Sequence, residues 1–430
     1  MANELFDSLP SHWKTATLGE ACTQGGGNVQ TGPFGSQLHA SDYVPVGIPF
    51  VMPQNIGDNR ILTDGVARIT PSDVERLSRY ILRKGDIVYS RRGDVERRAL
   101  VRNEEDGWMC GSGCLRVRFG REIVDPLYAS YYLGHPNVRS WIVRHAVGAT
   151  MPNLNTSILS NLPFVIPPLD EQKAIAHILG TLDDKIELNQ QTNQTLEAIA
   201  RALFKSWFID FDPVRAKLDG RQPAGMDAET AALFPAEFED SALGKIPKDW
   251  KVQIIGDVIE FAYGKPLKQP DRQHGIVPVY GSNGQIGWHN KSLVKAPGIV
   301  IGRKGNPGTV VWTPIDFYPI DTTFYAIPIS STKSLHYLFH ALCLQDLPSL
   351  AADSAVPGLN RNLAYMNKLL IPSEECLEAF DSIVNGISAK VHITNQEAIT
   401  LTSIRDALLP KLLSGEIRVQ DAETVVEAVT

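Results

Sequence analysis

Two segments of the chain end a strand-like run with a basic pair and a glycine. Ile87–Asp94 reads Ile-Val-Tyr-Ser-Arg-Arg-Gly-Asp, and Ile299–Asn306 reads Ile-Val-Ile-Gly-Arg-Lys-Gly-Asn, at an offset of 212 residues. Basic side chains bind phosphates, arginine also pairs with guanine edges, and a glycine lets two backbones approach closely. A structural turn with incidental arginines is the alternative, but paired charge in both copies favours contact with phosphates or bases. The candidate residues are Arg91, Arg92, Arg303, Lys304 and Asn306.

The first basic pair lies inside a positively charged stretch of an otherwise acidic protein. The whole chain has a formal net charge of −7, which speaks mildly against nucleic acid as a partner, whereas residues 76–121 hold twelve basic and six acidic residues. Arginine dominates this stretch, and its guanidinium suits bidentate contacts to phosphate and guanine. For any one arginine here, including Arg97 and Arg98, a solvated strand face explains the charge equally well.

Known catalytic motifs are missing from the sequence. There is no Gly-x-x-x-x-Gly-Lys-Ser/Thr phosphate loop, no Asn/Asp-Pro-Pro-Tyr box, no Gly-x-Ser-x-Gly elbow and no His-Glu-x-x-His pair. Cys110 and Cys114 flank Gly-Ser-Gly, but no second Cys or His pair has matching spacing, so small buried thiols are favoured over zinc ligands. The chain is therefore predicted to bind rather than to catalyse, and to hold no cofactor or metal of its own.

An internal repeat places the basic pairs in two copies of one frame. Leu9-Pro10-x-x-Trp13-Lys14 returns as Ile246-Pro247-x-x-Trp250-Lys251 at an offset of 237 residues. Met151-Pro152-x-Leu154-Asn155 returns as Val356-Pro357-x-Leu359-Asn360 at an offset of 205, so the second copy is 32 residues shorter between the two motifs. A fixed frame with a variable insert is what a protein needs to bind identical partners at two places while recognising two different targets.

Composition and local patterns indicate several folded domains of the α+β class. The chain has 430 residues, 43% of them hydrophobic, which suggests roughly two to four domains. Ile48–Val51, Asp86–Tyr89 and Leu115–Phe119 have the pattern of strands, and Tyr128–His145 has that of a helix. The expected bounds are 1–168 for a first globular domain, 169–210 for a central long helix, 211–242 for a linker, 243–372 for a second globular domain, 373–419 for a C-terminal long helix and 420–430 for a loose tail.

The sequence has no membrane or export signal. No apolar run approaches the roughly 18 residues of a membrane helix. The first seven residues lack the basic and apolar stretches of a signal peptide. The chain is therefore expected in the cytoplasm and away from membranes.

Apolar residues that recur by sevens predict a coiled coil. After Pro167-Pro168 they form two tracks, and a matching pair of tracks follows 205 residues later, with Thr394 at the position of Asn189. Two seams of equal length most simply pack on each other, and the domain between them favours an antiparallel pair, although each helix could instead pack on its own domain. The seam residues are Ile175, Leu179, Leu182, Ile186, Asn189, Leu196, Leu203, Phe380, Val384, Ile387, Val391, Leu401 and Leu408.

The duplicated order of these motifs resembles the specificity (S) subunit of type I restriction-modification enzymes. The resemblance covers nearly the whole chain. It rests on both Leu/Ile-Pro-x-x-Trp openings, the Gly32-Pro33-Phe34-Gly35-Ser36 loop, both basic-glycine turns, Asn153-Leu154-Asn155 before Pro167-Pro168, and the closing segment from Ile404 to Ile417. The second copy departs from the pattern at the start of its long helix, where Glu374-Glu375-Cys376 replaces Asp170-Glu171-Gln172.

The resemblance implies a division of labour between subunits. Two target-recognition domains would each read one half of a split, asymmetric double-stranded DNA target, with Gly32, Phe34 and Ser36 joining Arg91, Arg92, Arg97, Arg98, Arg303, Lys304 and Asn306 as candidate contacts. Two long antiparallel coiled-coil helices would join the domains in a pseudo-twofold frame and set the gap between half-sites. Two modification subunits would dock on that frame and carry S-adenosylmethionine, and restriction subunits would use ATP and Mg.

Helix length is compatible with such a spacer. A helix over residues 171–207 would be roughly 55 Å long, or on the order of 16 base pairs of B-DNA. Three alternatives stay open. One is a coiled-coil scaffold without a nucleic-acid role, another is an enzyme with an unrecognised site in the glycine-rich loops, and the third is the recognition subunit of a related system such as type IIB.

Overall fold

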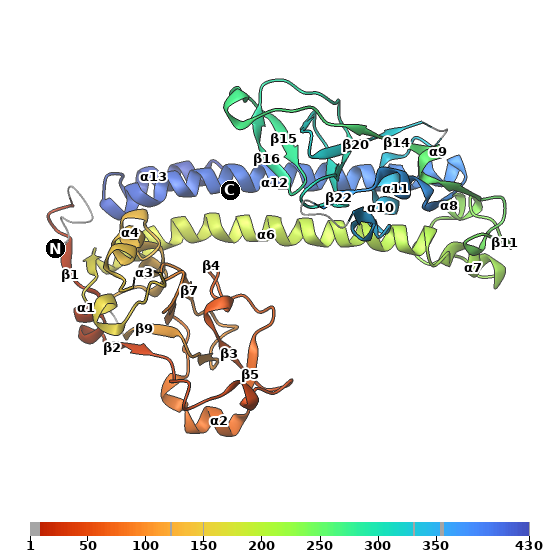
Figure 1. The fold of residues 1–430 in the computed structure, drawn as a ribbon. Coiled ribbons are helices and arrows are strands. Elements are labelled where there is room, and N and C mark those ends of the chain that lie inside the picture. The colour runs from red at the N-terminus through yellow and green to blue at the C-terminus, as the bar shows by residue number, and fades with distance from the viewer. Residues whose placement is uncertain (1–8, 121–122, 149, 330–331, 353–356, 430) are drawn as a thin grey trace. The chain divides into compact units, whose positions relative to one another are not determined.

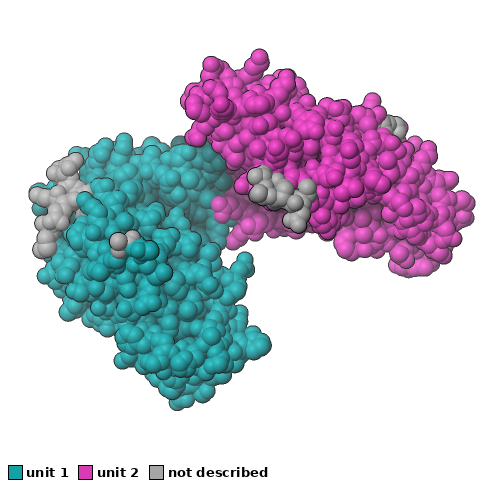
Figure 2. Space-filling view, in the orientation of Figure 1, with its two compact units in different colours: residues 1–188, 397–430 teal, residues 189–396 magenta. Residues whose placement is uncertain are grey.

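The computed structural model describes residues 9–120, 123–148, 150–329, 332–352 and 357–429. The chain forms two compact units, residues 1–188 with 397–430 (unit 1) and residues 189–396 (unit 2), drawn in separate colours in Figure 2. Residues 1–8 of the expected first domain, Arg121 of the basic stretch and Val356 of the second Pro-x-Leu-Asn motif lie outside the described residues.

Unit 1 contains a five-stranded sheet in the order β2-β9-β6-β7-β4 and a three-stranded sheet in the order β5-β3-β8. Figure 1 labels most of these strands, drawn in orange and brown. The pairs β3–β8 and β4–β7 are parallel, and the other pairs are antiparallel. The predicted strands near residues 48, 87 and 115 are confirmed, and the predicted helical segment 128–145 is divided between two helices, α3 and α4. The bounds are β2 Gly26–Thr31, β3 Ile48–Val51, β4 Asp58–Asn59, β5 Ala67–Ile69, β6 Ile87–Ser90, β7 Arg98–Leu100, β8 Met109–Cys110 and β9 Cys114–Gly120, with helices α1 Leu18–Gln24, α2 Pro71–Arg76, α3 Pro126–Tyr132, α4 Pro136–His145 and α5 Thr156–Ser160.

Unit 2 repeats this topology with one strand fewer in the larger sheet. Its sheets have the orders β14-β20-β17-β18 and β16-β15-β19, and β15–β19 is parallel as β3–β8 is in unit 1. The internal repeat therefore corresponds to a repeated fold, and the α+β class is confirmed. The bounds are β14 Ile259–Tyr263, β15 Val277–Gly281, β16 Gly284–His289, β17 Gly298–Gly302, β18 Val310–Thr313, β19 Tyr318–Pro319 and β20 Thr323–Pro328, with α9 Ile255–Val258, α10 Leu335–Cys343 and α11 Arg361–Met366, and a short β21–β22 pair, Ala351–Ala352 with Gly358–Leu359.

The two opening motifs lead into equivalent two-stranded sheets. β1 (Lys14–Thr17) pairs with β10 (Pro163–Ile166), and β13 (Lys251–Ile254) pairs with β23 (Lys368–Ile371). Lys14 faces Ile166 and Lys251 faces Ile371, so the register is the same in both copies. Each pair holds the start of a globular domain against the strand that precedes a long helix.

The two long helices are α6 (Leu169–Phe208) and α12 (Glu374–Ser414), and they pack antiparallel in each unit. In unit 1, Asp183 bonds to Arg405 at 2.7 Å and Lys185 lies 3.3 Å from Glu397. In unit 2, Asn193 Nδ2 donates to Asn395 Oδ1 at 2.7 Å, and the Thr394 hydroxyl donates to Asn193. The antiparallel pairing predicted from the heptads is therefore present in both units.

The predicted seam lies between the helices, with its polar layer buried. Asn189, Asn193 and Thr394 are 5%, 6% and 3% exposed, so the layer is a true core layer. Thr394 bonds to Asn193, because the antiparallel register places these two residues at the same level. The remaining seam residues divide into two groups: Ile175, Leu179, Leu182, Ile186, Phe380, Val384, Leu401 and Leu408 are buried, and Leu196, Leu203, Ile387 and Val391 are half-buried.

Two expected segments need correction. The expected linker 211–242 forms α7 (Asp212–Leu218), α8 (Ala228–Ala232) and β11 (Phe238–Ser241), which pairs with β12 (Gly244–Pro247), because Val214 and Phe234 are buried in the core of unit 2. The expected loose tail 420–430 is mostly helix α13 (Val419–Glu427), because Ala422 and Val426 join the core of unit 1. The long helices end at Phe208 and Ser414 rather than at 210 and 419.

Candidate nucleic-acid interface

In unit 1, four loops meet at one point through backbone hydrogen bonds. Gly32 N donates to Cys114 O at 2.9 Å, and Arg91 N donates to Gly113 O at 2.8 Å. On the other side of the basic turn, Leu154 N donates to Arg91 O at 2.8 Å and Gly93 N donates to Pro152 O at 3.1 Å. We call this assembly junction 1; its members are Gly32, Arg91–Gly93, Gly113–Cys114 and Pro152–Leu154.

Unit 2 contains the same assembly bond for bond. Gly264 N donates to Thr323 O at 3.1 Å, and Arg303 N donates to Thr322 O at 2.9 Å. Leu359 N donates to Arg303 O at 2.8 Å, and Gly305 N donates to Pro357 O at 3.1 Å. We call this assembly junction 2; its members are Gly264, Arg303–Gly305, Thr322–Thr323 and Pro357–Leu359. The basic turns and the Pro-x-Leu-Asn motifs, separate in the sequence, are therefore parts of one structural element.

Local sequence explains how each junction forms. A side chain at Gly32 would begin 2.0 Å from Gly111 O, and one at Gly264 would begin 2.2 Å from Ile320 O, so both positions require glycine for close backbone approach. Gly93 and Gly305 adopt φ of 75° and 86°, a left-handed conformation that glycine tolerates best.

The Pro-x-Leu-Asn motifs secure the other side of each junction. Leu154 and Leu359 are buried, and they fix the motif to the domain core. The side chains of Asn155 and Asn360 then cap α5 and α11 by accepting from Ile158 N and Leu363 N. The result is a rigid turn in each unit whose second basic residue, Arg92 or Lys304, is exposed.

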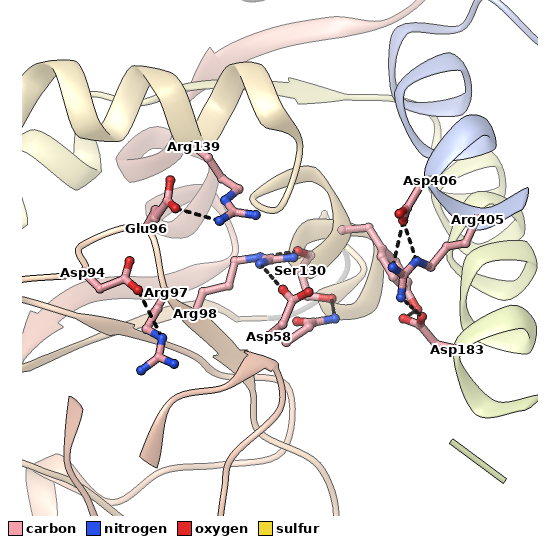
Figure 3. A network of polar contacts seen from close by, with 12 residues as sticks. Asp58, Asp94, Glu96, Arg97, Arg98, Ser130, Arg139, Asp183, Arg405 and Asp406 are labelled. Atoms are coloured by element: carbon pink, nitrogen blue, oxygen red, sulfur yellow. Dashed lines mark hydrogen bonds and ion pairs between the residues drawn. The ribbon is translucent and has the colours of Figure 1, made fainter. Parts of the chain in front are cut away.

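Much of the positive charge of the 76–121 stretch is neutralised within the domain. Arg97 pairs with Asp94 at 3.2 Å, as Figure 3 shows, whereas Glu96 of the same stretch pairs with Arg139, which lies outside it, at 2.7 Å. Asp86, which is buried, binds Arg118, and the hydrogen bond to Asp86 raises the pKa of that arginine. Arg76 and Arg83 also have carboxylate partners. The stretch is therefore less available to DNA than its net charge suggested.

Arg98 is buried in the domain, so the prediction that it contacts DNA is corrected. Its side chain is 6% exposed, its Nε donates to Ser130 O at 2.8 Å, and its Nη1 lies 3.3 Å from Asp58 (Figure 3). A side chain at Gly134 would begin 1.8 Å from the Arg98 guanidinium, which shows how tightly the cation is enclosed. A buried guanidinium must be hydrogen-bonded and paired to offset its loss of hydration, and Arg98 meets this requirement through Ser130 and Asp58. The role of Arg98 is therefore to hold β7 against α3.

The other candidate residues of unit 1 differ in availability. Phe34 is 56% exposed and Ser36 is also exposed, on a loop in which Gln37 accepts from Phe34 N and from the Tyr80 hydroxyl. Arg92 is exposed without an ion pair within the described part of the chain, whereas Arg97 keeps Asp94. The Gly32 loop and the basic turn, predicted separately, are thus joined at junction 1.

Unit 2 holds residues that the sequence reasoning missed. Gly264 was not recognised as the counterpart of Gly32, although both follow a strand and precede a proline within two residues. Tyr263 and Arg361 lie against Arg303: the Arg303 and Arg361 guanidinium carbons are 4.8 Å and 4.9 Å from the centre of the Tyr263 ring. Asn306 is exposed on the same turn as Lys304.

The globular domain of each unit contacts its long helix at an equivalent position of that helix. In unit 1 the Tyr131 hydroxyl donates to Asp183 at 2.7 Å, and in unit 2 Trp312 Nε1 donates to Ser388 at 3.0 Å. Asp183 and Ser388 are related by the 205-residue offset of the repeat. Burial first, and Asp183 next, raise the pKa of Tyr131 well above its usual value, so its hydroxyl remains a donor.

Neither a metal cluster nor a membrane helix is found among the residues that the structure describes. No group of three or more His, Cys, Asp or Glu side chains there could hold a metal ion. No helix in these ranges combines the length and apolarity that a bilayer requires. Cys110 and Cys114 are unbridged and buried, and burial raises the pKa of the Cys110 thiol to about 12.

Comparison with known proteins gives consistent results. Residues 10–198 and 247–372 match the family described as type I restriction modification DNA specificity domain. The chain is 28% identical to the type I restriction enzyme HindI specificity subunit of Haemophilus influenzae, over 86% of this chain and 94% of that one. It is 24% identical to the MjaIX specificity subunit of Methanocaldococcus jannaschii, over 96% and 95%. The crystal structure of a type I restriction-modification S subunit from M. genitalium superposes with a TM-score of 0.59 at 18% identity, covering 95% of this chain and 97% of that one.

Proposed function

Since the chain belongs to the family of type I restriction modification DNA specificity domains, we propose that it is the sequence-specific DNA-recognition subunit of a type I restriction-modification complex. The observation that carries the proposal is the pair of junctions. Each presents an exposed basic residue on a rigid glycine turn, and the four backbone bonds of one recur in the other. Two equivalent sites of positive charge are what two half-sites of one DNA duplex require.

Each unit reads one half of a split target in this proposal. The strand order and the junction are shared, whereas the loops between them differ in length and sequence. Shared elements give both units the same placement on the phosphate backbone, and unlike loops give each unit its own base contacts. The target is therefore expected to be asymmetric and interrupted.

The long helices serve as spacer and as support for partner subunits. Their seam is closed by apolar residues, with one polar layer at Asn189, Asn193 and Thr394 that favours a single register. Two modification subunits would dock on the repeated frame and carry S-adenosylmethionine. Restriction subunits would supply the steps that use ATP and Mg. The chain itself would contribute binding and no catalysis, in the cytoplasm, where the DNA is.

The experiment that tests this function is methylated-base mapping. DNA from cells that express the chain with its modification subunit is compared with DNA from cells that lack only this chain. Adenine methylation confined to one two-part, gapped motif is the expected result. If the complex assembles and no chain-dependent methylation occurs, the proposal is rejected.

A second experiment separates spacing from reading. Inserting residues into both helices near Asn189 and Thr394 should lengthen the gap in the motif while both half-sites keep their sequence. A changed half-site after such an insertion would contradict the role of the helices as a spacer.

A further inference from the structure

In junction 2, two arginine side chains lie against one tyrosine ring, and unit 1 lacks the tyrosine and one of the arginines at the corresponding positions. The guanidinium groups of Arg303 and Arg361 both lie within 5 Å of the centre of the Tyr263 ring, at 4.8 Å and 4.9 Å. Tyr263 is 49% exposed, so this cluster lies at the surface. All three residues belong to junction 2 or adjoin it, since Tyr263 precedes Gly264 and Arg361 follows Leu359 by two positions.

Both arginines are held in place without being neutralised. Arg303 Nη1 donates to Asp321 O at 2.9 Å, and Arg361 Nη1 donates to Phe261 O at 3.4 Å. Each cation also interacts with the tyrosine ring, which fixes the plane of the guanidinium. Within the described ranges neither arginine has a carboxylate at ion-pair distance, whereas Arg97, Arg98 and Arg118 of unit 1 all do.

Two like charges beside one ring repel each other, and an anion between or beside them removes that repulsion. Each side chain uses one N–H group on a backbone carbonyl and keeps other N–H groups for a ligand. A phosphate matches such donors in charge and geometry, and the DNA backbone offers phosphates at regular intervals.

We propose that Arg303 and Arg361, positioned by Tyr263, form a phosphate-binding pair that fixes unit 2 on the backbone of its DNA half-site. This inference rests on the proposed DNA-recognition function and goes further by assigning phosphate contact, rather than base reading, to two residues of one unit. The corresponding positions of unit 1 are Thr31, Arg91 and Thr156, so one arginine is present there and the aromatic and second arginine are not. Unit 2 therefore adds a phosphate contact to those that the shared junction elements give to both units.

The test measures DNA binding against salt for the full chain assembled with its modification subunits. The probe is a labelled duplex that contains the motif obtained from methylation mapping. Arg303→Ala and Arg361→Ala should each make the negative slope of log K against log salt shallower by about 0.9, which corresponds to roughly eightfold weaker binding at 0.1 M salt. Replacing Tyr263 and Arg361 by threonine, the residues of unit 1, should reproduce the loss for Arg361 within a folded unit.

Two variants serve as controls. Arg361→Lys should restore most of the slope, because counterion release requires charge rather than the guanidinium shape. Arg221→Ala, at an exposed arginine of unit 2 that pairs with Asp219, should leave the slope unchanged. A measurement of circular dichroism confirms that each variant is folded before binding is measured.

The outcomes separate this inference from the function on which it rests. An unchanged slope in folded Arg303→Ala and Arg361→Ala overturns the phosphate pair while leaving DNA recognition intact. A changed methylated motif that lysine does not rescue shows base reading and also overturns it. If the unmodified complex does not prefer its motif over unrelated DNA, the proposed function itself fails.

Discussion

Replacing Asp183 should loosen the first recognition domain from its helices. Asp183 accepts from the Tyr131 hydroxyl and from Arg405, each at 2.7 Å, and its side chain is 17% exposed. Burial alone would lower the pKa of Arg405, yet its hydrogen bonds to Asp183 and Asp406 raise it well above its usual value, so the cation persists. Asp183→Ala removes the acceptor of both bonds and leaves Arg405 with Asp406 alone.

The expected cost follows from these contacts. A hydrogen bond to a charged group contributes about 1.5–3 kcal/mol, and partial exposure with the remaining Asp406 bond reduces the total, so we expect a loss of about 3 kcal/mol. The matched control is Ser388→Ala, which removes a single neutral bond from Trp312 at the equivalent position of unit 2. That change should cost about 1 kcal/mol.

Urea denaturation of the full chain, followed by circular dichroism and by amide exchange of α3 and α6, measures the effect. A double-mutant cycle of Asp183→Ala with Arg405→Ala isolates the direct pair and should give a coupling of about 1–2 kcal/mol. The amides of α3 should exchange faster in Asp183→Ala, while those of α10 should not. If Asp183→Ala costs no more than Ser388→Ala, or if the cycle is additive, the charged contact does not hold the domain.

Three further changes test other parts of the structure. Arg98→Met should lower the free energy of unfolding by about 3 kcal/mol and leave the salt slope of DNA binding unchanged. Arg92→Ala should make that negative slope shallower. The opposite pattern would return Arg98 to the DNA contacts. His135 caps α4 through Nδ1, which accepts from Asn137 N, and burial lowers the pKa of His135 to about 4. Below pH 6.5 the unfolded chain therefore binds more protons at His135 than the folded chain does. The free energy of unfolding should fall as the pH is lowered from 6.5 towards 4. His135→Asn keeps a capping side chain and should reduce the stability difference between pH 7.5 and pH 5 by about 1 kcal/mol, seen in urea midpoints at both pH values; an unchanged difference would assign the acid sensitivity elsewhere. Asn193→Leu should raise the denaturation midpoint slightly but allow a second register of the two long helices. Disulfide cross-linking of the helices would then detect two populations. A single register would show that the polar layer is not needed to fix the register.

The sequence was most informative where a pattern repeats. The heptads predicted both long helices and their antiparallel pairing, because two apolar stripes of equal length are most simply buried against each other. The basic turns were also found, because charge beside glycine is visible without a structure. Their union with the Pro-x-Leu-Asn motifs was not predicted, since main-chain hydrogen bonds can form between almost any two residues, and the glycines of a junction do not show which segment they approach.

Charge was the least reliable guide to the site. Arg98 was a candidate contact and Arg118 was counted in the basic stretch, yet Asp58 and Asp86 neutralise these two arginines in the folded domain. Asp58 lies outside the stretch 76–121 and 40 residues from Arg98, and Asp86 lies inside it but 32 residues from Arg118, so a net charge for the stretch could not show which arginines are paired. The segment 211–242 was misjudged for a related reason: its prolines and glycines suggested a linker, while a few apolar residues were enough to bury it.

The backbone bonding of the junctions has a consequence for how the protein can change over generations. Nearly every residue supplies a main-chain N–H and carbonyl, so most side chains of a junction are not needed for its hydrogen bonds. Only two glycines and a buried leucine are required in each junction. Substitutions can therefore accumulate on the exposed turns without dismantling the support beneath them. A lineage could acquire a new DNA target one loop at a time, and each intermediate would still fold.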